Sequence, residues 1–120
     1  MNNENLKRRT KKFALEVIQF VEVLPHDDTG RVLGRQLLRS GTSVGANYRA
    51  ACRAKSNADF ISKMGNVEEE ADESGYWIEL LMESGKVGQT KALPLLKEAG
   101  ELLAIAVASI RTGRKSGGRE

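Results

Sequence analysis

Apolar residues recur along the chain at the three- and four-residue spacing of a helix face, and they do so in four separate segments. These segments cover residues 6–24, 29–53, 57–84 and 91–112. The third segment is the most regular, with a repeat of four and three at Phe60, Met64, Val67, Ala71, Ser74, Ile78 and Leu81. The other predicted core positions are Phe13, Val17, Phe20 and Leu24, then Leu33, Leu37, Val44, Tyr48 and Ala51, and finally Leu96, Ala99, Leu103, Ala106 and Ile110.

Turn-forming residues and helix caps separate the four segments. Residues 25–30, PHDDTG, form a turn cluster, and Gly85 lies just after the third segment. Ser56 and Thr90 are the predicted N-caps of the last two segments, and Gly113 is predicted to stop the fourth. The short connections imply that consecutive helices are antiparallel neighbours.

We therefore predict an all-α fold: a single antiparallel up-down four-helix bundle over residues 1–112, followed by a flexible basic tail over residues 113–120. The 120 residues, of which 40% are hydrophobic and 29% charged, suit one domain with its own core. The chain has neither an 18-residue apolar run nor an apolar block behind its basic N-terminus, so we expect no membrane span and no secretory signal. The single cysteine, Cys52, cannot form an internal disulfide, and a cytoplasmic location is expected.

Charge is distributed unevenly along the chain. Residues 1–55 carry eleven Lys or Arg against five Asp or Glu, whereas residues 56–110 carry four against ten. Such a distribution either attracts polyanions or pairs one helix with its neighbour. The candidate nucleic-acid-binding residues are Lys7, Arg8, Arg9, Lys11, Lys12, Arg31, Arg35, Arg49, Arg53, Arg114 and Lys115. Because both termini of an antiparallel bundle lie at one end, their cations form either one basic rim or simply a solubilising charged end.

A row of polar residues lies beside the apolar stripe of the second segment. It either contacts a ligand or RNA, or belongs to a polar network at a helix–helix or subunit contact, with acidic residues of the third segment as partners. We favour the network because buried polar groups need partners. Its candidate members are Gln36, Arg39, Ser43, Asn47, Glu69, Glu70 and Glu73.

Four bulky residues fall outside the core stripes: Leu38, Tyr76, Trp77 and Leu80. Interface centres are enriched in such aromatic and large apolar side chains. We therefore predict that these four residues belong to an oligomer interface.

No motif for catalysis, metal binding or a cofactor is present. His26 is the only histidine and lies in a predicted loop, so the acidic residues of the third segment lack the Glu-x-x-His pattern of di-iron bundles. Phosphate-binding loops and a serine nucleophile elbow are also missing. We expect no enzyme activity, no metal, no cofactor and no small-molecule substrate.

Three stretches carry a family resemblance: RQLLRSGTSVGANY at residues 35–48, KSNADFI at 55–61 and EEADESGYWIELL at 69–81. Together they resemble the bacterial four-helix-bundle family, also called the 23S rRNA intervening-sequence protein or S23 family. The resemblance implies a four-helix bundle assembled as a homopentameric ring. A similar family, the accessory variability determinant of diversity-generating retroelements, forms a basic pentameric barrel that binds a reverse transcriptase and nucleic acid. This chain reads Tyr-Arg-Ala-Ala after Asn47, where many members read Ile-Ala-Glu-Gly, so its second helix is more basic.

The predicted function is a non-enzymatic, homo-oligomeric binding or scaffold module. RNA or a nucleoprotein is the expected partner of the basic surfaces. The alternative is a purely protein-binding structural adaptor without a nucleic-acid role.

Overall fold

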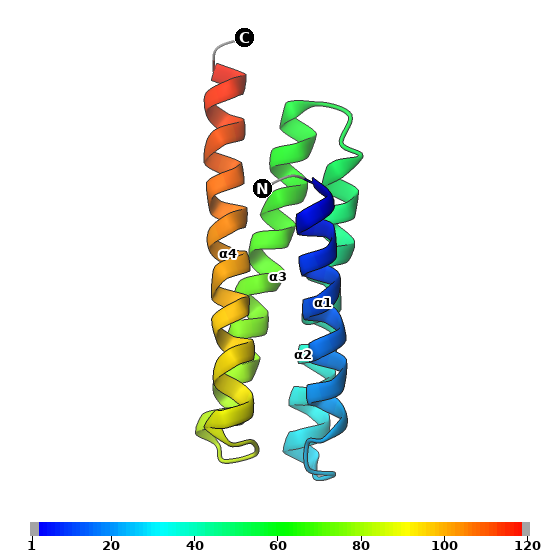
Figure 1. Ribbon diagram of the computed structural model, residues 1–120, viewed down its shortest axis with the longest axis vertical. Helices are drawn as coiled ribbons and strands as arrows, with labels where there is room; N and C mark the ends of the chain where they lie inside the picture. Colours follow the sequence, from blue (N-terminus) through cyan, green and yellow to red (C-terminus); the bar gives the residue numbers. More distant parts are fainter. Residues whose placement is uncertain (1–2, 119–120) are drawn as a thin grey trace.

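The computed structural model describes residues 3–118, and these residues form four helices. Helix α1 spans Asn3–Glu22, α2 spans Asp28–Cys52, α3 spans Asn57–Glu83 and α4 spans Gln89–Gly118. They run alternately down and up the long axis of a rod 53 × 22 × 20 Å in extent, with the start of α1 and the end of α4 toward the same end of the rod (Figure 1). The predicted all-α antiparallel four-helix bundle is therefore confirmed.

Side-chain caps fix where the central helices begin. The Asp27 carboxylate accepts a hydrogen bond from the Gly30 amide at 2.8 Å, and the Ser56 hydroxyl accepts one from the Asp59 amide at 3.0 Å. Each bond satisfies an amide that has no partner within the first helical turn. After α3 the chain turns at Gly85, whose φ of 78° is a backbone conformation that glycine adopts without strain.

Helix α4 is longer than the sequence predicts. It begins at Gln89, so Thr90 lies inside the helix instead of capping it. It also continues through Gly113 to Gly118, where a flexible tail is expected; residues 119–120 lie outside the described part of the chain. The reason is tertiary contact: the Asn57 side chain donates a hydrogen bond to the Gly113 carbonyl at 2.7 Å, and α3 packs closely against this glycine.

The core follows the predicted stripes of α1, α2 and α3 almost completely. All the expected core residues of these helices are buried except Leu33 and Phe60, which are half-buried. In α4, however, Leu95 and Leu102 are buried, whereas Leu96 and Leu103, the predicted positions, are half-buried. The predicted Ala99, Ala106 and Ile110 are buried as expected, so only the two leucine positions differ, each by one residue. Two adjacent leucine stripes fit the same helical period.

Helix α1 packs closely against α2 and only sparsely against α4. A Cβ atom on Gly41 would lie 2.8 Å from a methyl carbon of Val17, and one on Gly45 would lie 3.2 Å from the Thr10 hydroxyl oxygen. The glycines of α2 therefore allow the backbones of these two helices to approach. On its other side α1 is connected to α4 by Arg9, which pairs with two glutamates of α4.

Candidate nucleic-acid interface

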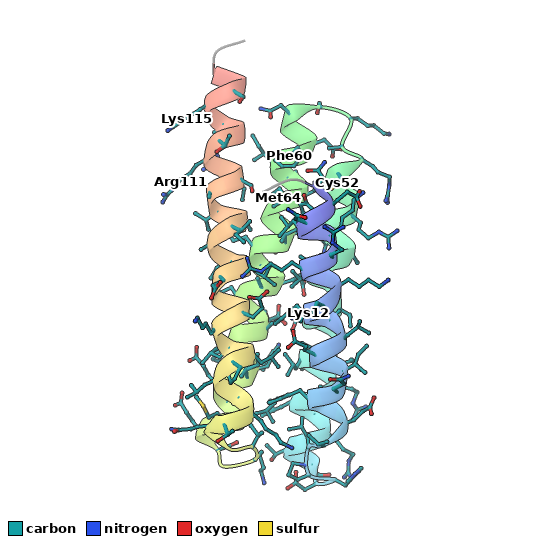
Figure 2. The ribbon with its side chains drawn as sticks, in the orientation of Figure 1. Lys12, Cys52, Phe60, Met64, Arg111 and Lys115 are labelled. Atoms are coloured by element: carbon teal, nitrogen blue, oxygen red, sulfur yellow. The ribbon has the colours of Figure 1, made fainter. Side chains whose placement is uncertain are left out.

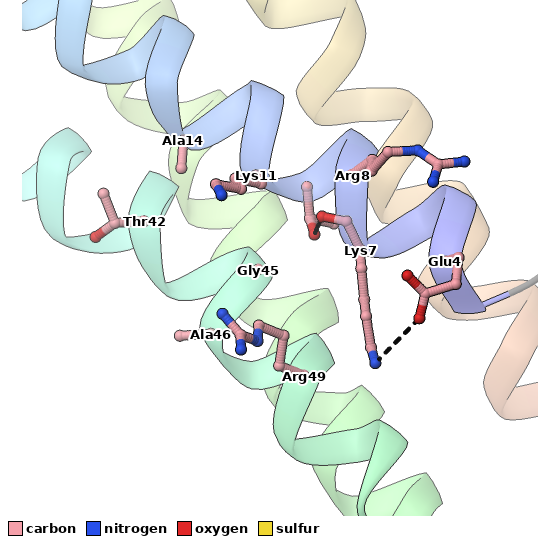
Figure 3. A pocket seen from close by; sticks show the side chains of 10 residues that line it. Glu4, Lys7, Arg8, Lys11, Ala14, Thr42, Gly45, Ala46 and Arg49 are labelled. Atoms are coloured by element: carbon pink, nitrogen blue, oxygen red, sulfur yellow. Dashed lines mark hydrogen bonds and ion pairs between the residues drawn. The ribbon is translucent and has the colours of Figure 1, made fainter.

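A groove of about 520 Å³ lies between the first half of α1 and the second half of α2 (Figure 3). It is lined by Glu4, Lys7, Arg8, Thr10, Lys11, Ala14, Thr42, Gly45, Ala46 and Arg49. Its floor is formed by small residues of both helices. These residues let α1 approach α2, and their short side chains leave the space between the two helices open to the surface.

The rim of this groove is basic. Lys7 and Lys11 reach from α1 toward α2, where Arg49 projects from the opposite side, whereas Arg8 points away from α2 (Figure 3). Lys7 and Lys11 are one helical turn apart, about 6 Å along the axis, so they lie on the same side of α1. This spacing suits contact with successive anionic groups on one extended ligand.

The cations of the groove are poorly neutralised by the protein itself. Lys7 lies 3.6 Å from the Glu4 carboxylate in an exposed i,i+3 pair, which contributes little and is easily exchanged. Within residues 3–118, neither Lys11 nor Arg49 has an ion-pair partner. Three cations thus face one exposed carboxylate, and the groove has a net attraction for polyanions.

Arg9, another predicted nucleic-acid contact, is occupied elsewhere. Its guanidinium lies 2.7 Å from the carboxylates of both Glu98 and Glu101 on α4. The hydrogen bonds that Arg9 donates to the Glu98 carboxylate raise the pKa of Arg9 further above its ordinary value, although partial burial opposes the shift. Arg9 therefore holds α1 to α4 and is not available to a phosphate.

The remaining predicted cations do not form one surface. Arg31 pairs with Asp28 at 2.6 Å and, together with Arg35, lines a second groove of about 470 Å³ at the other end of the α1–α2 face. Lys12 and Arg53 are exposed near the first groove without lining it. The last cations, Arg114 and Lys115, lie near the end of α4.

The expected basic rim at the ends of the chain is divided between two sides of the bundle. Figure 2 shows Arg111 and Lys115 on the outer side of α4, pointing away from the other helices. Lys7 and Lys11 of α1 face α2 instead. The structure thus has a basic groove between α1 and α2 and a separate basic group on α4.

The polar row of α2 lies against α3 and forms a network within the chain. Arg39 pairs with Glu70 at 3.2 Å and also with Glu73, which in turn accepts a hydrogen bond from the Trp77 indole at 3.3 Å. Gln36 accepts a hydrogen bond from Arg39. This geometry agrees with the helix–helix network, because every guanidinium nitrogen of Arg39 has a partner within the chain.

Two further members of the row bond to their own helix. The Ser43 hydroxyl donates to the Arg39 carbonyl at 2.6 Å, and the Asn47 amide donates to the Ser43 carbonyl at 2.9 Å. Glu69 is exposed on the outer side of α3 and is not brought to the network.

The four residues predicted for an oligomer interface do not share one patch. Leu38 lies on α2 and lines the second groove, whereas Tyr76, Trp77 and Leu80 all belong to α3. Tyr76 is exposed and its ring centre lies 5.2 Å from that of Trp77, which is half-buried against the core. Leu80 is half-buried on the same helix. Tyr76 is therefore the member of the set that a partner would reach most directly.

Sequence reasoning missed the groove as a shape. It identified the cations, but not Thr10 and Ala14, which face the small residues of α2 from α1 and complete the floor. The available signal was the run of small residues around Gly45, which indicates close approach by a helix without identifying which one.

Two classes of site are absent from the described residues. No three of their histidine, cysteine, aspartate and glutamate side chains cluster closely enough to hold a metal ion. None of the four helices combines the length and the apolar character needed to cross a membrane.

Comparison with known proteins identifies relatives by sequence and by structure. A profile of the family described as 23S rRNA-intervening sequence protein matches residues 3–108. The chain is also similar to a crystal structure of a protein of unknown function from the S23 ribosomal protein family of Bacteroides thetaiotaomicron. The two share 32% identity and a TM-score of 0.85, over 92% of this chain and 99% of that one. No curated protein matches the chain.

Proposed function

Because the chain belongs to the family of 23S rRNA-intervening sequence proteins, we propose that it is a non-enzymatic, homo-oligomeric module that binds RNA through the groove between α1 and α2. The observation that carries the proposal is the set of poorly neutralised cations, Lys7, Lys11 and Arg49, around a floor of small residues. Phosphate groups are the natural ligands of these cations, because binding of a protein cation to a phosphate releases a counterion that was condensed on the nucleic acid.

The groove is suited to the RNA backbone and not to reading bases. None of its lining residues is aromatic, so it offers no surface on which a base would stack. Lys and Arg contacts to phosphates position a nucleic acid without reading its sequence. Binding through this groove is therefore expected to be independent of sequence and strongly dependent on salt.

We also propose that the module acts as an assembly in the cytoplasm, with the homopentamer implied by the family resemblance as the expected form. Each added copy contributes another basic groove. Linked grooves raise the effective concentration of protein around one RNA molecule, so weak single contacts add up to useful avidity.

A protein-binding adaptor is the second candidate. The observation that favours it is the exposure of Tyr76, 54%, next to Trp77 on α3. Aromatic side chains of this kind are common at the centre of protein interfaces. In this alternative the basic groove serves only to keep the protein soluble.

Fluorescence anisotropy with a structured RNA across a salt series tests the proposal. The test variant replaces Lys7, Lys11 and Arg49 with Gln. We expect it to bind more weakly at low salt and to lower the dependence of log affinity on log salt by about two, because each lost phosphate contact contributes about 0.7–0.9 to that slope.

A variant with the same change in net charge provides the control. It replaces Lys91, Lys97 and Arg111, three exposed cations of α4, with Gln. Equal weakening by both variants would assign binding to net charge and reject the groove. Failure of the unsubstituted protein to bind RNA at low salt would reject the nucleic-acid role and leave the adaptor.

A further inference from the structure

A third hollow, of about 640 Å³, lies at the end of the bundle where α1 begins. It is bounded by the start of α1, the start of α3 and the last turns of α4, which extend beyond α1 at this end (Figure 1). Its floor contains the apolar side chains of Leu6, Phe60 and Ile105. Phe60 is half-buried, so part of its ring is accessible from the hollow.

The rim of this bundle-end hollow is polar but carries no charge. Asn3, Asn57, Thr112 and Ser116 contribute amide and hydroxyl groups, and no lysine, arginine, aspartate or glutamate lines it. The lack of charge distinguishes it from the basic groove on the other side of α1. An apolar floor with a few convergent polar groups is the usual composition of a site for a small organic group.

Each of the two asparagine side chains uses one polar atom of its amide in a hydrogen bond within the protein. The Tyr48 hydroxyl donates to the Asn3 Oδ1 at 3.1 Å, and burial raises the pKa of Tyr48, which keeps this donor protonated. The Asn57 Nδ2 donates to the Gly113 carbonyl at 2.7 Å. The Asn3 Nδ2 remains as a donor and the Asn57 Oδ1 as an acceptor, so the hollow presents one of each from fixed positions.

We propose that the bundle-end hollow binds an unpaired nucleobase of the RNA strand whose backbone lies in the α1–α2 groove. A base has a flat apolar face for Phe60 and an edge of donors and acceptors for the two amides, which is how single-stranded RNA is recognised. A phosphate would find no cation in the hollow. A purely apolar group would leave both amides without partners.

The two sites are continuous along the first turns of α1. Lys7 lines the groove and Leu6 lines the hollow, while on α2 the adjacent residues Arg49 and Tyr48 face the groove and the hollow respectively. A helix is about 10 Å across, so one strand passes from the first site to the second around the start of α1. The proposal rests on the proposed RNA-binding function and assigns the base contact that the groove lacks.

The first experiment tests the hollow without any phosphate. Adenosine and uridine are titrated separately into the ¹⁵N-labelled full chain, and NMR follows the side-chain amides of Asn3 and Asn57. We expect saturable shifts at these amides and at the backbone of residues 112–116, with little change at Lys7 and Lys11. Ribose 5-phosphate, which lacks a base, should shift the groove and not the hollow.

The second experiment separates base from backbone in RNA. Anisotropy compares a single-stranded RNA with an abasic strand of the same length, for the unsubstituted protein and for Phe60→Leu. We expect Phe60→Leu to weaken binding of the RNA about tenfold, which corresponds to about 1.4 kcal/mol and lies within the range for base stacking. Binding of the abasic strand should not change. Ala108→Met, which fills the exposed side of the hollow, should act in the same way if Phe60→Leu disturbs the core.

The outcomes distinguish failure of this site from failure of the proposed function. Equal binding of RNA and abasic RNA, with no shift from either nucleoside, would reject the base site while leaving the groove. Nucleoside shifts at the hollow without any RNA binding would reject the RNA function and keep a nucleoside site. Shifts scattered over the surface, insensitive to Ala108→Met, would also reject the site.

Discussion

At the scale of residues, single glycines decide how closely α1 and α2 approach. The sequence shows these glycines but not the residues that lie opposite them. Isolated glycine lowers helix propensity by about 1 kcal/mol relative to alanine, so Gly41 and Gly45 indicate a contact without naming it. The structure identifies that contact as Val17 and Thr10 of α1. Which helix lies opposite a glycine depends on the arrangement of the whole bundle, and no local pattern contains it.

Gly41→Ala should therefore destabilise the protein although alanine is the better helix former. The new Cβ would lie 2.8 and 2.9 Å from the two methyl groups of the fully buried Val17, which has no space to move. Overpacking costs about 1–3 kcal/mol, more than the propensity gain of about 1 kcal/mol. We expect a lower midpoint in urea denaturation.

Gly100→Ala is the matched control, because nothing lies within 4 Å of its Cβ position on an exposed part of α4. This substitution should stabilise the protein by about 0.5–1 kcal/mol. A higher urea midpoint for Gly41→Ala, like that expected at Gly100, would contradict the close approach of α1.

At the scale of helices, the hydrophobic period predicts that a helix is present and which way it runs. It predicts less well which side of the helix is buried and where the helix ends. The spacing in α1, α2 and α3 identifies the buried side because each helix has one dominant apolar stripe. In α4 two stripes compete, and packing selects Leu95 and Leu102 over their neighbours. Gly113 does not end this helix because Asn57 and α3 support it from outside.

The cap of α2 gives the helix a dependence on pH. The Gly30 amide and then Lys86, at 2.9 Å, lower the pKa of Asp27 from its ordinary value of 3.8. A lowered folded-state pKa contributes stability above the ordinary value and loses it as pH falls through the folded-state value. Asp27→Ala should therefore lower the urea midpoint at pH 7, and the difference should shrink below about pH 3.8.

Two variants separate the cap from its charge. Asp27→Asn keeps an oxygen for the Gly30 amide and should lose the pH dependence while retaining part of the stability. Asp28→Ala, which removes only an exposed pair with Arg31, should change the midpoint little. A difference between Asp27→Ala and the unsubstituted protein that persists undiminished at pH 2 would contradict this role of the carboxylate.

At the scale of the whole molecule, the cations of the sequence divide into those paired with acidic residues of a neighbouring helix and those left accessible. Part of the positive charge is neutralised inside the bundle, by Arg39 with α3 and by Arg9 with α4. Another part, Lys7, Lys11 and Arg49, lines the α1–α2 groove. The list of cations could be read from the sequence, but their division into paired and free members could not, because Glu98 and Glu101 are about 90 residues away from Arg9 in the chain.

The bundle-end hollow was outside the reach of sequence reasoning for a similar reason. Asn3 and Asn57 are unremarkable polar residues in sequence and become a pair only because α1 starts where α3 starts. Their anchoring partners, Tyr48 and Gly113, come from the other two helices. A site built from all four helices leaves no contiguous motif.

The proposed assembly makes a prediction about mass. The chain is 13.2 kDa, and we expect light scattering behind size exclusion to give a multiple of this value. Tyr76→Glu should weaken the assembly by at least about tenfold, because a charge placed in the apolar centre of an interface loses its hydration without gaining a partner.

Leu93→Glu is the control that makes this test specific. Leu93 is an exposed apolar residue, at 47% comparable to Tyr76, but it lies near the start of α4 and outside the predicted interface. The added carboxylate should be tolerated there, with the mass unchanged. If both variants dissociate equally, added negative charge alone opposes assembly and Tyr76 loses its assignment. If the unsubstituted chain has the mass of a monomer at high concentration, the assembly is rejected, and RNA binding must then be explained by one groove alone.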